Sequence, residues 1–307
     1  MNLMNNEKHY NTLNNYYKST YNKKVFKVAL NANFSCPNKQ NGNTGCSYCS
    51  SNGSGDFAGD KNDDLITQFN KQKIMMHKKW PDAYYIPYLQ ANSNTYDTLE
   101  NLKKVYEPLT NLENIVAISI ATRPDCLEDD KIKYLGELNK RIKIQVELGL
   151  QTIFSVTSNK INRGHSLECF TDAVDKLRKE GIEVVVHIIN GLPGETKEMM
   201  LETAKFLSKL DIQGVKIHML HVMYHTKMGI EYLKKPFPLL TLEEYVDITV
   251  SQLRLFPKNF IIHRITGDAP RELLIEPKWT LKKLVVSNEI DKYMRKYNYY
   301  QGDLYQE

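Results

Sequence analysis

The sequence predicts an α/β fold, namely an incomplete TIM-type (βα)6 barrel followed by a short α/β C-terminal extension. Two observations support this prediction. Apolar, β-branched runs alternate six times with helix-like segments, which is the order that right-handed parallel crossovers produce. The unusual polar and cysteine-containing sequences follow these runs, where barrels of parallel strands place their functional loops. Periodicity alone does not separate such a barrel from a doubly wound sheet, but six units favour the barrel.

The expected strands and helices alternate along the chain. Pro81, Pro108 and Gly181 stand directly after three of the helices, where such residues end a helix. A further strand at residues 260–266 and a last helix at residues 280–297 follow the six units. The six strands are expected at residues 24–34, 83–90, 115–122, 142–150, 182–189 and 215–222. The six helices are expected at residues 63–80, 98–107, 128–141, 167–180, 195–210 and 241–256.

The predicted organisation has three parts. Residues 1–23 form an N-terminal arm or helix, residues 24–230 form the partial barrel, and residues 231–307 form a C-terminal extension packed on the barrel. No internal repeat or low-complexity linker interrupts the pattern, so a second compact domain is not expected.

The composition indicates a soluble protein, and we expect it in the cytoplasm. The 307 residues are 41% hydrophobic and 25% charged, with no apolar run as long as a membrane span and no secretory signal at residues 1–12. Five cysteines in this spacing do not suggest a disulfide framework. The net charge of +5 is uneven, because residues 1–80 carry 11 Lys and 5 acidic residues, whereas residues 81–307 carry 30 basic and 31 acidic residues.

Three cysteines lie close together on the loop after the first expected strand. Cys36, Cys46 and Cys49 have the spacing C-x9-C-x2-C, and soft sulfur ligands suit zinc or an iron–sulfur centre. Structural zinc usually takes four protein ligands, and neither Cys126 nor Cys169 repeats a ligand pair. Three cysteines would leave one iron of a four-iron cluster without a protein ligand, as a substrate-binding cluster needs. The spacing favours the cluster and leaves zinc open.

The other expected strands also end in unusual polar sequences. Because the carboxyl ends of parallel strands meet at one rim, we expect these segments to gather beside the cysteine loop. The segments are residues 90–96, 121–126, 147–152, 187–195 and 218–221.

Taken together, these motifs resemble the radical S-adenosylmethionine (SAM) family. The cysteine loop, with Tyr48 before its last cysteine, resembles that of radical SAM enzymes, and its x9 spacing resembles the radical SAM half of the Elongator catalytic subunit. Five further motifs resemble the bacterial YtqA/YhcC-type (MnmL-like) radical SAM proteins, and the resemblance extends from about residue 24 to residue 279. These motifs are TRPDC at 122–126, VELGLQ at 146–151, INRGH at 161–165, GLPGE at 191–195 and HRITGDAP at 263–270.

The resemblance implies two cofactors and their chemistry. Cys36, Cys46 and Cys49 would hold a [4Fe-4S] cluster, with the amino and carboxylate groups of SAM on the open iron. One-electron reduction, by a low-potential donor such as flavodoxin or ferredoxin, would cleave SAM to a 5′-deoxyadenosyl radical that abstracts hydrogen from the substrate. The protein would supply orientation and exclude water.

The resemblance also implies a set of SAM-contacting residues. Tyr48 would pack near the adenine, which the backbone from Gly191 to Gly194 would also approach, and Glu147 and Gln151 would face the ribose and methionine part. The usual Gly-Gly-Glu after the second strand is replaced by Asn-Ser-Asn-Thr at residues 92–95, so the ligand of the SAM amino group is open. The remaining members of the expected set are Asn94, Thr122 and His187.

The catalytic residues are not fixed by the sequence, and four candidates stand at the expected rim. Arg123 and Asp125 fit a substrate role and an ion pair across their turn equally well. Cys126 could face the substrate, although a small buried apolar side chain is the better interpretation. His218 could line the site.

The Elongator resemblance implies a tRNA substrate. We expect modification of the C5 side chain of the wobble uridine, for example conversion of carboxymethylaminomethyl to aminomethyl, and the basic N-terminal quarter supports this. Acetyl transfer is not expected, because the chain ends at Glu307 without the second half of the Elongator subunit. Two alternatives remain, namely a radical SAM enzyme acting on a small metabolite and a zinc-bound RNA-binding module without catalysis. The sequence does not indicate the oligomeric state.

Overall fold

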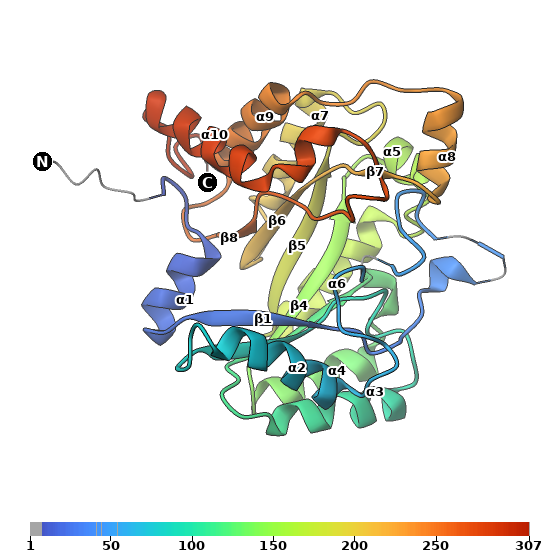
Figure 1. The fold of residues 1–307 in the computed structure, drawn as a ribbon, viewed down its shortest axis with the longest axis vertical. Helices are drawn as coiled ribbons and strands as arrows, with labels where there is room; N and C mark the ends of the chain where they lie inside the picture. Colours follow the sequence, from blue (N-terminus) through green and yellow to red (C-terminus); the bar gives the residue numbers. More distant parts are fainter. Residues whose placement is uncertain (1–7, 41, 44, 54, 307) are drawn as a thin grey trace, which may run out of the picture.

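A curled parallel sheet forms the centre of the molecule (Figure 1). The computed structural model describes residues 8–40, 42–43, 45–53 and 55–306. In this part of the chain seven strands lie in the order β1-β2-β3-β4-β5-β6-β8, and each is parallel to its neighbours. This arrangement confirms the predicted incomplete α/β barrel. The strands are β1 (Val25–Leu30), β2 (Tyr84–Leu89), β3 (Ile118–Thr122), β4 (Ile144–Gln151), β5 (Glu183–Asn190), β6 (Gly214–Met219) and β8 (Ile261–Arg264).

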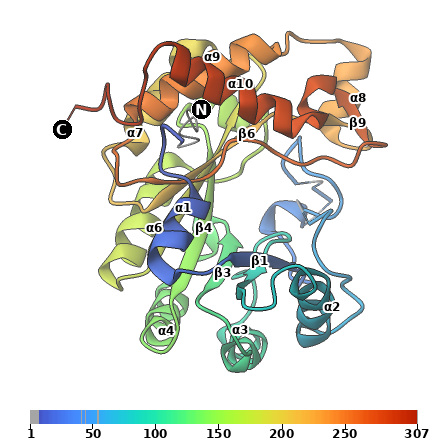
Figure 2. The ribbon, with the colours of Figure 1, turned by 60° about the vertical axis from the view of Figure 1, so that its left-hand side comes forward.

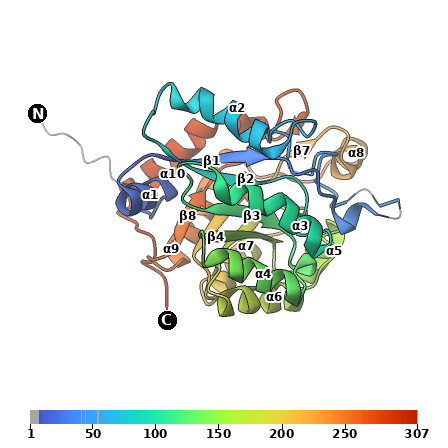
Figure 3. The same ribbon diagram turned by 90° about the horizontal axis from the view of Figure 1, so that it is seen from below.

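Helices cover the outer face of the sheet (Figure 3). Several begin at a polar residue whose side chain accepts a hydrogen bond from the backbone N–H three residues later, as Asp64, Thr98, Ser166 and Thr196 do. The helices between strands are α2 (Leu65–His77), α3 (Leu99–Tyr106), α4 (Asp129–Asn139), α5 (Ser155–Lys160), α6 (Leu167–Lys179), α7 (Lys197–Leu207), α8 (Lys227–Lys234) and α9 (Leu242–Leu255).

Alternation along the strands decides which side chains face the interior of the barrel. In β4, Val146 and Leu148 pack in the hydrophobic core with the helices, whereas Glu147 lines the internal cavity. The same alternation also directs polar side chains of other strands toward the cavity. These include Lys27 of β1, His187 of β5, and Lys216 and His218 of β6.

The expected further strand joins the main sheet. β8 pairs in parallel with β6, so residues beyond the sixth unit add a seventh strand to the described sheet. The strand predicted at residues 215–222 is divided in the structure. β6 ends at Met219, and Val222–Met223 form the separate strand β7. β7 pairs with β9 (Leu274–Glu276) in an antiparallel ribbon beside α8.

The first described helix lies at the open side of the barrel, and residues just before it contact the last helix. α1 (Leu13–Tyr21) contacts both β1 and β8, and the backbone N–H of Ile262 donates to Asn11 O at 2.8 Å. The C-terminal helix α10 (Lys283–Lys296) packs beside α9 (Figure 2). Among the described residues, no helix combines the length and the apolar character needed to cross a membrane.

Candidate active site

A cavity of about 780 Å³ occupies the interior of the barrel. Side chains from all seven strands of the described sheet line it, together with the cysteine loop at the carboxyl end and Leu13 and Tyr17 of α1. Two groups of residues dominate its wall. We call Cys36, Cys46 and Cys49 the cysteine rim, and we call Lys27, Tyr88, Glu147, His187 and Lys216 the charged floor.

The structure places all three thiols of the cysteine rim on the cavity, as free cysteines. The hydrogen bond from Cys49 lowers the pKa of Cys46 to about 6, with smaller contributions from Arg123 and Asn38 against the opposing effect of burial. Cys46 is therefore a thiolate at neutral pH, which is the form that binds metals.

Backbone and amide hydrogen bonds hold the cysteine loop in place. The backbone N–H of Ser47 donates to Ile161 O at 2.8 Å, and Asn162 Nδ2 donates to Gly45 O at 2.9 Å. Asn38 Nδ2 donates to Asn162 O at 2.5 Å and lies 3.6 Å from Cys46 Sγ. The INRGH motif at residues 161–165 thus supports the loop that carries the thiols.

The buried side chain of Arg163 links the end of β4 to the INRGH motif that supports the cysteine loop. Its side chain is 2% exposed, and its Nη1 donates to Leu150 O at 2.7 Å and to Thr152 O at 2.6 Å. Its Nε and Nη2 both donate to His165 O. Such a guanidinium satisfies several carbonyl groups at the end of β4 at once.

The four catalytic candidates occupy different positions. Arg123 and Asp125 form a two-point ion pair, with Nε to Oδ1 at 2.9 Å and Nη2 to Oδ2 at 2.7 Å, and Arg123 also faces the cavity. Cys126 is 1% exposed, burial raises its pKa to about 12, and it is not among the described residues that line the cavity. His218 lines the cavity, and its buried Nε2 has no hydrogen-bond partner in the described part of the chain.

The residues expected to contact SAM are divided between the cavity and its surroundings. Asn94 is fully buried behind the wall, where its Nδ2 donates to the carbonyl groups of Leu89 and Ala121. Gly191 and Gly194 form the turn after β5 at φ of 88° and 91°, a conformation that favours glycine, and they do not border the cavity among the residues described. The members that line the cavity are Tyr48, Thr122, Glu147, Gln151 and His187.

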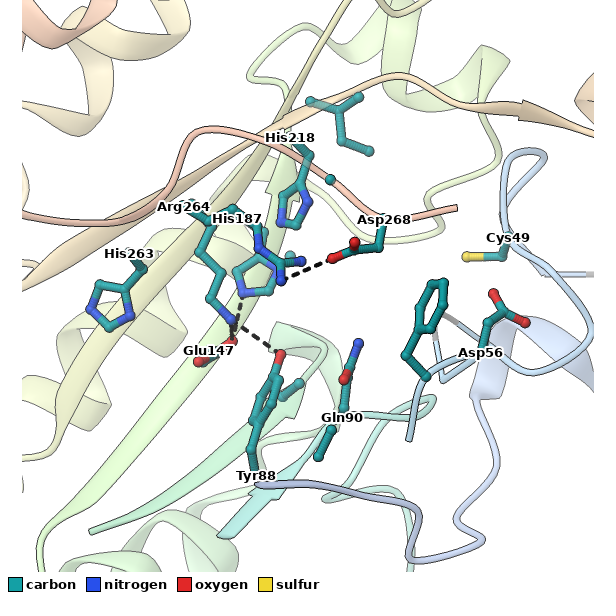
Figure 4. Close-up of a pocket in the computed structure, with 18 of the residues that line it drawn as sticks. Cys49, Asp56, Tyr88, Gln90, Glu147, His187, His218, His263, Arg264 and Asp268 are labelled. Carbon is teal, nitrogen blue, oxygen red and sulfur yellow. Dashed lines mark hydrogen bonds and ion pairs between the residues drawn. The ribbon is translucent and has the colours of Figure 1, made fainter. Parts of the chain in front are cut away.

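The charged floor is a buried ion-pair network around Glu147 (Figure 4). Lys27 Nζ lies 2.5 Å from Glu147 Oε1, and Lys216 Nζ donates to Oε2. His187 Nε2 lies 2.8 Å from the same Oε2. Lys216 Nζ also lies 3.3 Å from the hydroxyl oxygen of Tyr88.

Burial and the neighbouring charges together shift the pKa values of this network. Burial opposes ionisation of Glu147, but Lys216 and Lys27 outweigh it and hold the pKa of Glu147 well below its ordinary value. Burial lowers the pKa of Lys216 to about 7, although Glu147 partly counteracts the effect. Burial, reinforced by Lys216, lowers the pKa of His187 to about 4, so this imidazole is neutral at physiological pH.

Sequence reasoning identified Glu147 but missed its partners. Lys27 and Lys216 are single lysines inside the apolar strands VFKVAL and GVKIHM, and a lysine at such a position requires a buried counter-charge. Arg264 and Asp268, which also line the cavity, form an ion pair at 3.1 Å. A search for cations that could neutralise Glu147 would have pointed to the two lysines.

The chemistry of the cysteine rim fits an iron–sulfur cluster. Three soft sulfur donors face one cavity, and Cys46 is poised as a thiolate. In the described residues, no three His, Cys, Asp or Glu side chains are grouped around the position of a single metal ion. The ligands of a four-iron cluster bind different iron atoms, so a cluster does not need that grouping.

Comparison with known proteins gives two family matches. The model described as the Radical SAM superfamily matches residues 39–207, which is more than half of the chain. The model described as the Radical_SAM C-terminal domain matches residues 212–296. The two models together cover strands β2 to β9 and helix α10, and they begin after β1 and Cys36.

Three individual proteins are informative. The uncharacterized protein YtqA of Bacillus subtilis is 48% identical over 304 residues, which cover 98% of this chain and 94% of that protein. A tRNA uridine(34) acetyltransferase of Methanocaldococcus infernus is 28% identical over 208 residues, which cover 67% of this chain and 38% of that protein. The solved structure of Elp3 from the same archaeon, with an N-terminal deletion, has a TM-score of 0.70 and 20% identity, and covers 91% of this chain and 64% of that one. The last likeness shows a shared fold.

Proposed function

Because the chain belongs to the radical SAM superfamily, we propose that it is a radical SAM enzyme that modifies the C5 side chain of the wobble uridine of tRNA. The resemblance predicted from the motifs is confirmed at the level of the superfamily and of YtqA. Membership implies a [4Fe-4S] cluster and SAM as cofactors. It also argues against the zinc-bound RNA-binding module that the cysteine spacing left open.

The main support for tRNA as the substrate is the similarity to the tRNA uridine(34) acetyltransferase. That protein shares 28% identity with two thirds of this chain. Its name refers to uridine at position 34, so we transfer the nucleotide, and not the acetyl transfer, to this chain. The conversion proposed is carboxymethylaminomethyl to aminomethyl at C5. SAM would act as the two-electron oxidant of the CH2 group beside nitrogen, and water would hydrolyse the resulting imine, so that the C–N bond breaks and the two carbons leave as glyoxylate. A low-potential donor such as flavodoxin or ferredoxin would supply the first electron, and the electron lost on imine formation would return to it.

The side chains of the cavity have separate tasks in this proposal. Cys36, Cys46 and Cys49 would hold the cluster, which together with SAM supplies a carbon-centred radical able to abstract a hydrogen atom. Tyr48 and Gln151 line the wall beside the thiols and would orient SAM.

The charge of the cavity supports an anionic substrate. Among the described residues that line it, seven are Lys or Arg and three are Asp or Glu. A wobble base lies in a single-stranded loop and can be turned into a pocket, where its sugar and phosphates would meet a positive wall.

The decisive experiment is nucleoside mass spectrometry of tRNA from a strain that lacks the gene. We expect the wobble nucleoside with the unprocessed side chain to accumulate, and expect the wild-type gene, but not a Cys46→Ala variant, to restore the product. An unchanged nucleoside profile in the deletion strain would refute the tRNA proposal.

A small metabolite is the second candidate substrate. The cavity volume falls in the ordinary range of about 300 to 1,000 Å³ for small-molecule sites, and this observation favours it. Binding of tRNA that weakens steeply with salt would support the first candidate, and absence of tRNA binding at low salt would support the second.

A further inference from the structure

Lys216 retains hydrogen-bonding capacity that faces the cavity. Its ammonium carries three N–H donors, of which one is directed at Glu147 and one at Tyr88. Within the described residues, the same Nζ also lies 4.5 Å from the centroid of the Tyr88 ring, and no oxygen or nitrogen acceptor is found for the third donor. Lys27 differs, because Ser119, Gln145 and Glu147 accept from all three of its donors.

Three side chains lie in register across neighbouring strands at this point. His187 of β5 pairs with Lys216 of β6, and Lys216 pairs with Arg264 of β8. All three line the cavity, and adjacent strands are about 4.8 Å apart. His218, two residues after Lys216 on the same strand, faces the same side, and its ring lies 5.1 Å from the ring of His187.

The charges around this row leave a positive surplus. Among the described charged residues at this end of the cavity, Lys27, Lys216 and Arg264 face Glu147 and Asp268. The nearby histidines do not change the balance at neutral pH, because burial lowers the pKa values of His187, His218 and His263. When Lys216 is protonated, the cations outnumber the carboxylates, because Lys283 also pairs with Asp268. A bound monoanion would offset this excess and favour the protonated lysine.

Among the described side chains, unpartnered ring nitrogens lie on the same wall of the cavity: that of His218 is beside His187, and those of His263 are farther along, near Gly214 at the start of β6. The buried Nε2 of His218 and both ring nitrogens of His263 have no hydrogen-bond partner in the described part of the chain. Buried polar atoms are normally satisfied, so such a group indicates water or a ligand. In Figure 4, His187, His218 and Arg264 are drawn on the side of the cavity that carries Glu147, and all four line the cavity.

From this geometry we infer that Lys216, Arg264 and His218 form a subsite for a carboxylate group of the substrate. The inference rests on the proposed function only in taking the cavity as the substrate chamber. Lys216 would donate its third N–H and Arg264 its free guanidinium edge to the carboxylate oxygens, as charge-assisted hydrogen bonds. The subsite lies midway along β6, whereas the thiols lie on the loop after β1, so a substrate anchored there would direct its other end toward the cysteine rim.

The first test uses acetate as the probe and histidine side-chain NMR as the readout. We expect acetate at about 0.1 M to shift the signals of His187 and His218 in the wild-type protein and to leave those of His9 and His77 in place. Inorganic phosphate should shift the signals of His187 and His218 less than acetate does. No shift with acetate, or a larger shift with phosphate, would overturn the carboxylate assignment.

Two variants and a matched control make this test specific. Lys216→Met and Arg264→Gln should each abolish the acetate shift, whereas Lys24→Met should preserve it. Lys24 lines the same cavity but bonds Asn14 at 2.7 Å, away from the floor. Arg264→Gln leaves Asp268 paired with Lys283, so we expect this variant to fold. It therefore tests the subsite even if Lys216→Met fails to fold. If acetate still shifted the histidine signals in both Lys216→Met and Arg264→Gln, the subsite would be refuted.

The second test links the subsite to the proposed substrate. Anticodon stem-loops with a carboxymethylaminomethyl wobble uridine, or with the matching carboxamide, differ by one charge. Wild-type protein should bind the carboxylate form roughly tenfold to a hundredfold more tightly, and Lys216→Met should lose the difference. Equal binding of the two forms by wild-type protein would show that tRNA does not use the subsite. An acetate shift with an unchanged nucleoside profile in the deletion strain would refute the tRNA proposal and leave the carboxylate subsite standing.

Discussion

The cysteine rim and the charged floor share one cavity but are built in different ways. The rim is a loop whose three thiols lie within 14 residues and whose position is held by hydrogen bonds to residues 161–163. The floor is made of single side chains from β1, β2, β4, β5 and β6, and ion pairs within the wall hold it. From this difference we expect that changes in the loop affect cofactor binding, whereas removal of one partner of the buried ion pairs in the floor affects the stability of the barrel.

The largest expected effect is at the rim. Cys46→Ala should abolish formation of 5′-deoxyadenosine and lower the iron content after anaerobic reconstitution with SAM and dithionite, because it removes one of three sulfur ligands. Its free energy of unfolding should change by less than about 1 kcal/mol, since the thiol is only partly buried. Cys169→Ala, a partly exposed cysteine on α6, is the matched control and should retain activity. Full activity of Cys46→Ala would break the assignment of the rim.

The floor should show the opposite behaviour. Glu147→Gln leaves Lys27 and Lys216 without their shared counter-charge in the interior, and removing one partner of a buried network costs about 3 to 5 kcal/mol. Urea unfolding of the variant measures this loss. Glu202→Gln, which removes an exposed ion pair with Lys205, should cost less than about 1 kcal/mol. If both variants unfolded at the same urea concentration, the floor would have no special role in stability.

The difference between the two regions also explains what the sequence could predict. The rim was predictable because its ligands are close in sequence and their spacing has a chemical meaning. The order of strands and helices was predictable because alternating apolar patterns are local, and β4 and β5 lie within one or two residues of their expected bounds.

The floor could not be predicted in the same way. Lys27 and Glu147 are 120 residues apart, and Lys216 follows Glu147 by 69. Their contact depends on the curl of the sheet, which no local pattern records. The same limit applies to Asn94, since the direction of its side chain depends on hydrogen bonds to β2 and β3.

A smaller effect is expected from the support of the rim. Asn38→Ala removes the hydrogen bond to Asn162 O at 2.5 Å and the amide contact to Cys46. We expect a loss of about 1 to 2 kcal/mol in the free energy of unfolding and faster removal of iron by a chelator. Asn43→Ala, on the exposed part of the same loop, should leave both quantities unchanged. Equal iron loss from the two variants would mean that Asn38 does not position the rim.

The smallest effect distinguishes the floor by its pH dependence. Burial lowers the pKa of Lys216 to about 7, whereas in the unfolded chain it has its ordinary value of 10.5. Between these values the unfolded chain binds the proton and the folded chain does not, so the contribution of Lys216 to stability is lost as the pH falls through 7. The wild-type free energy of unfolding should gain about 1 kcal/mol from this group between pH 7 and pH 8.

Lys216→Met provides the reference for that measurement. The variant lacks the titrating ammonium, while Glu147 keeps Lys27 and His187 as partners. The wild-type value minus the variant value, taken from urea unfolding at each pH, should therefore rise from pH 7 to pH 8, because titrations elsewhere in the chain cancel in the difference. If the difference did not change over this range, Lys216 would remain fully charged in the folded barrel, and its pKa would not be lowered by burial. The groups that face Lys216 are Glu147 of β4, Tyr88 of β2, Lys27 of β1, His187 of β5 and Arg264 of β8. Burial lowers the pKa of Lys216 most, Lys27 and Arg264 lower it further, and Glu147 raises it.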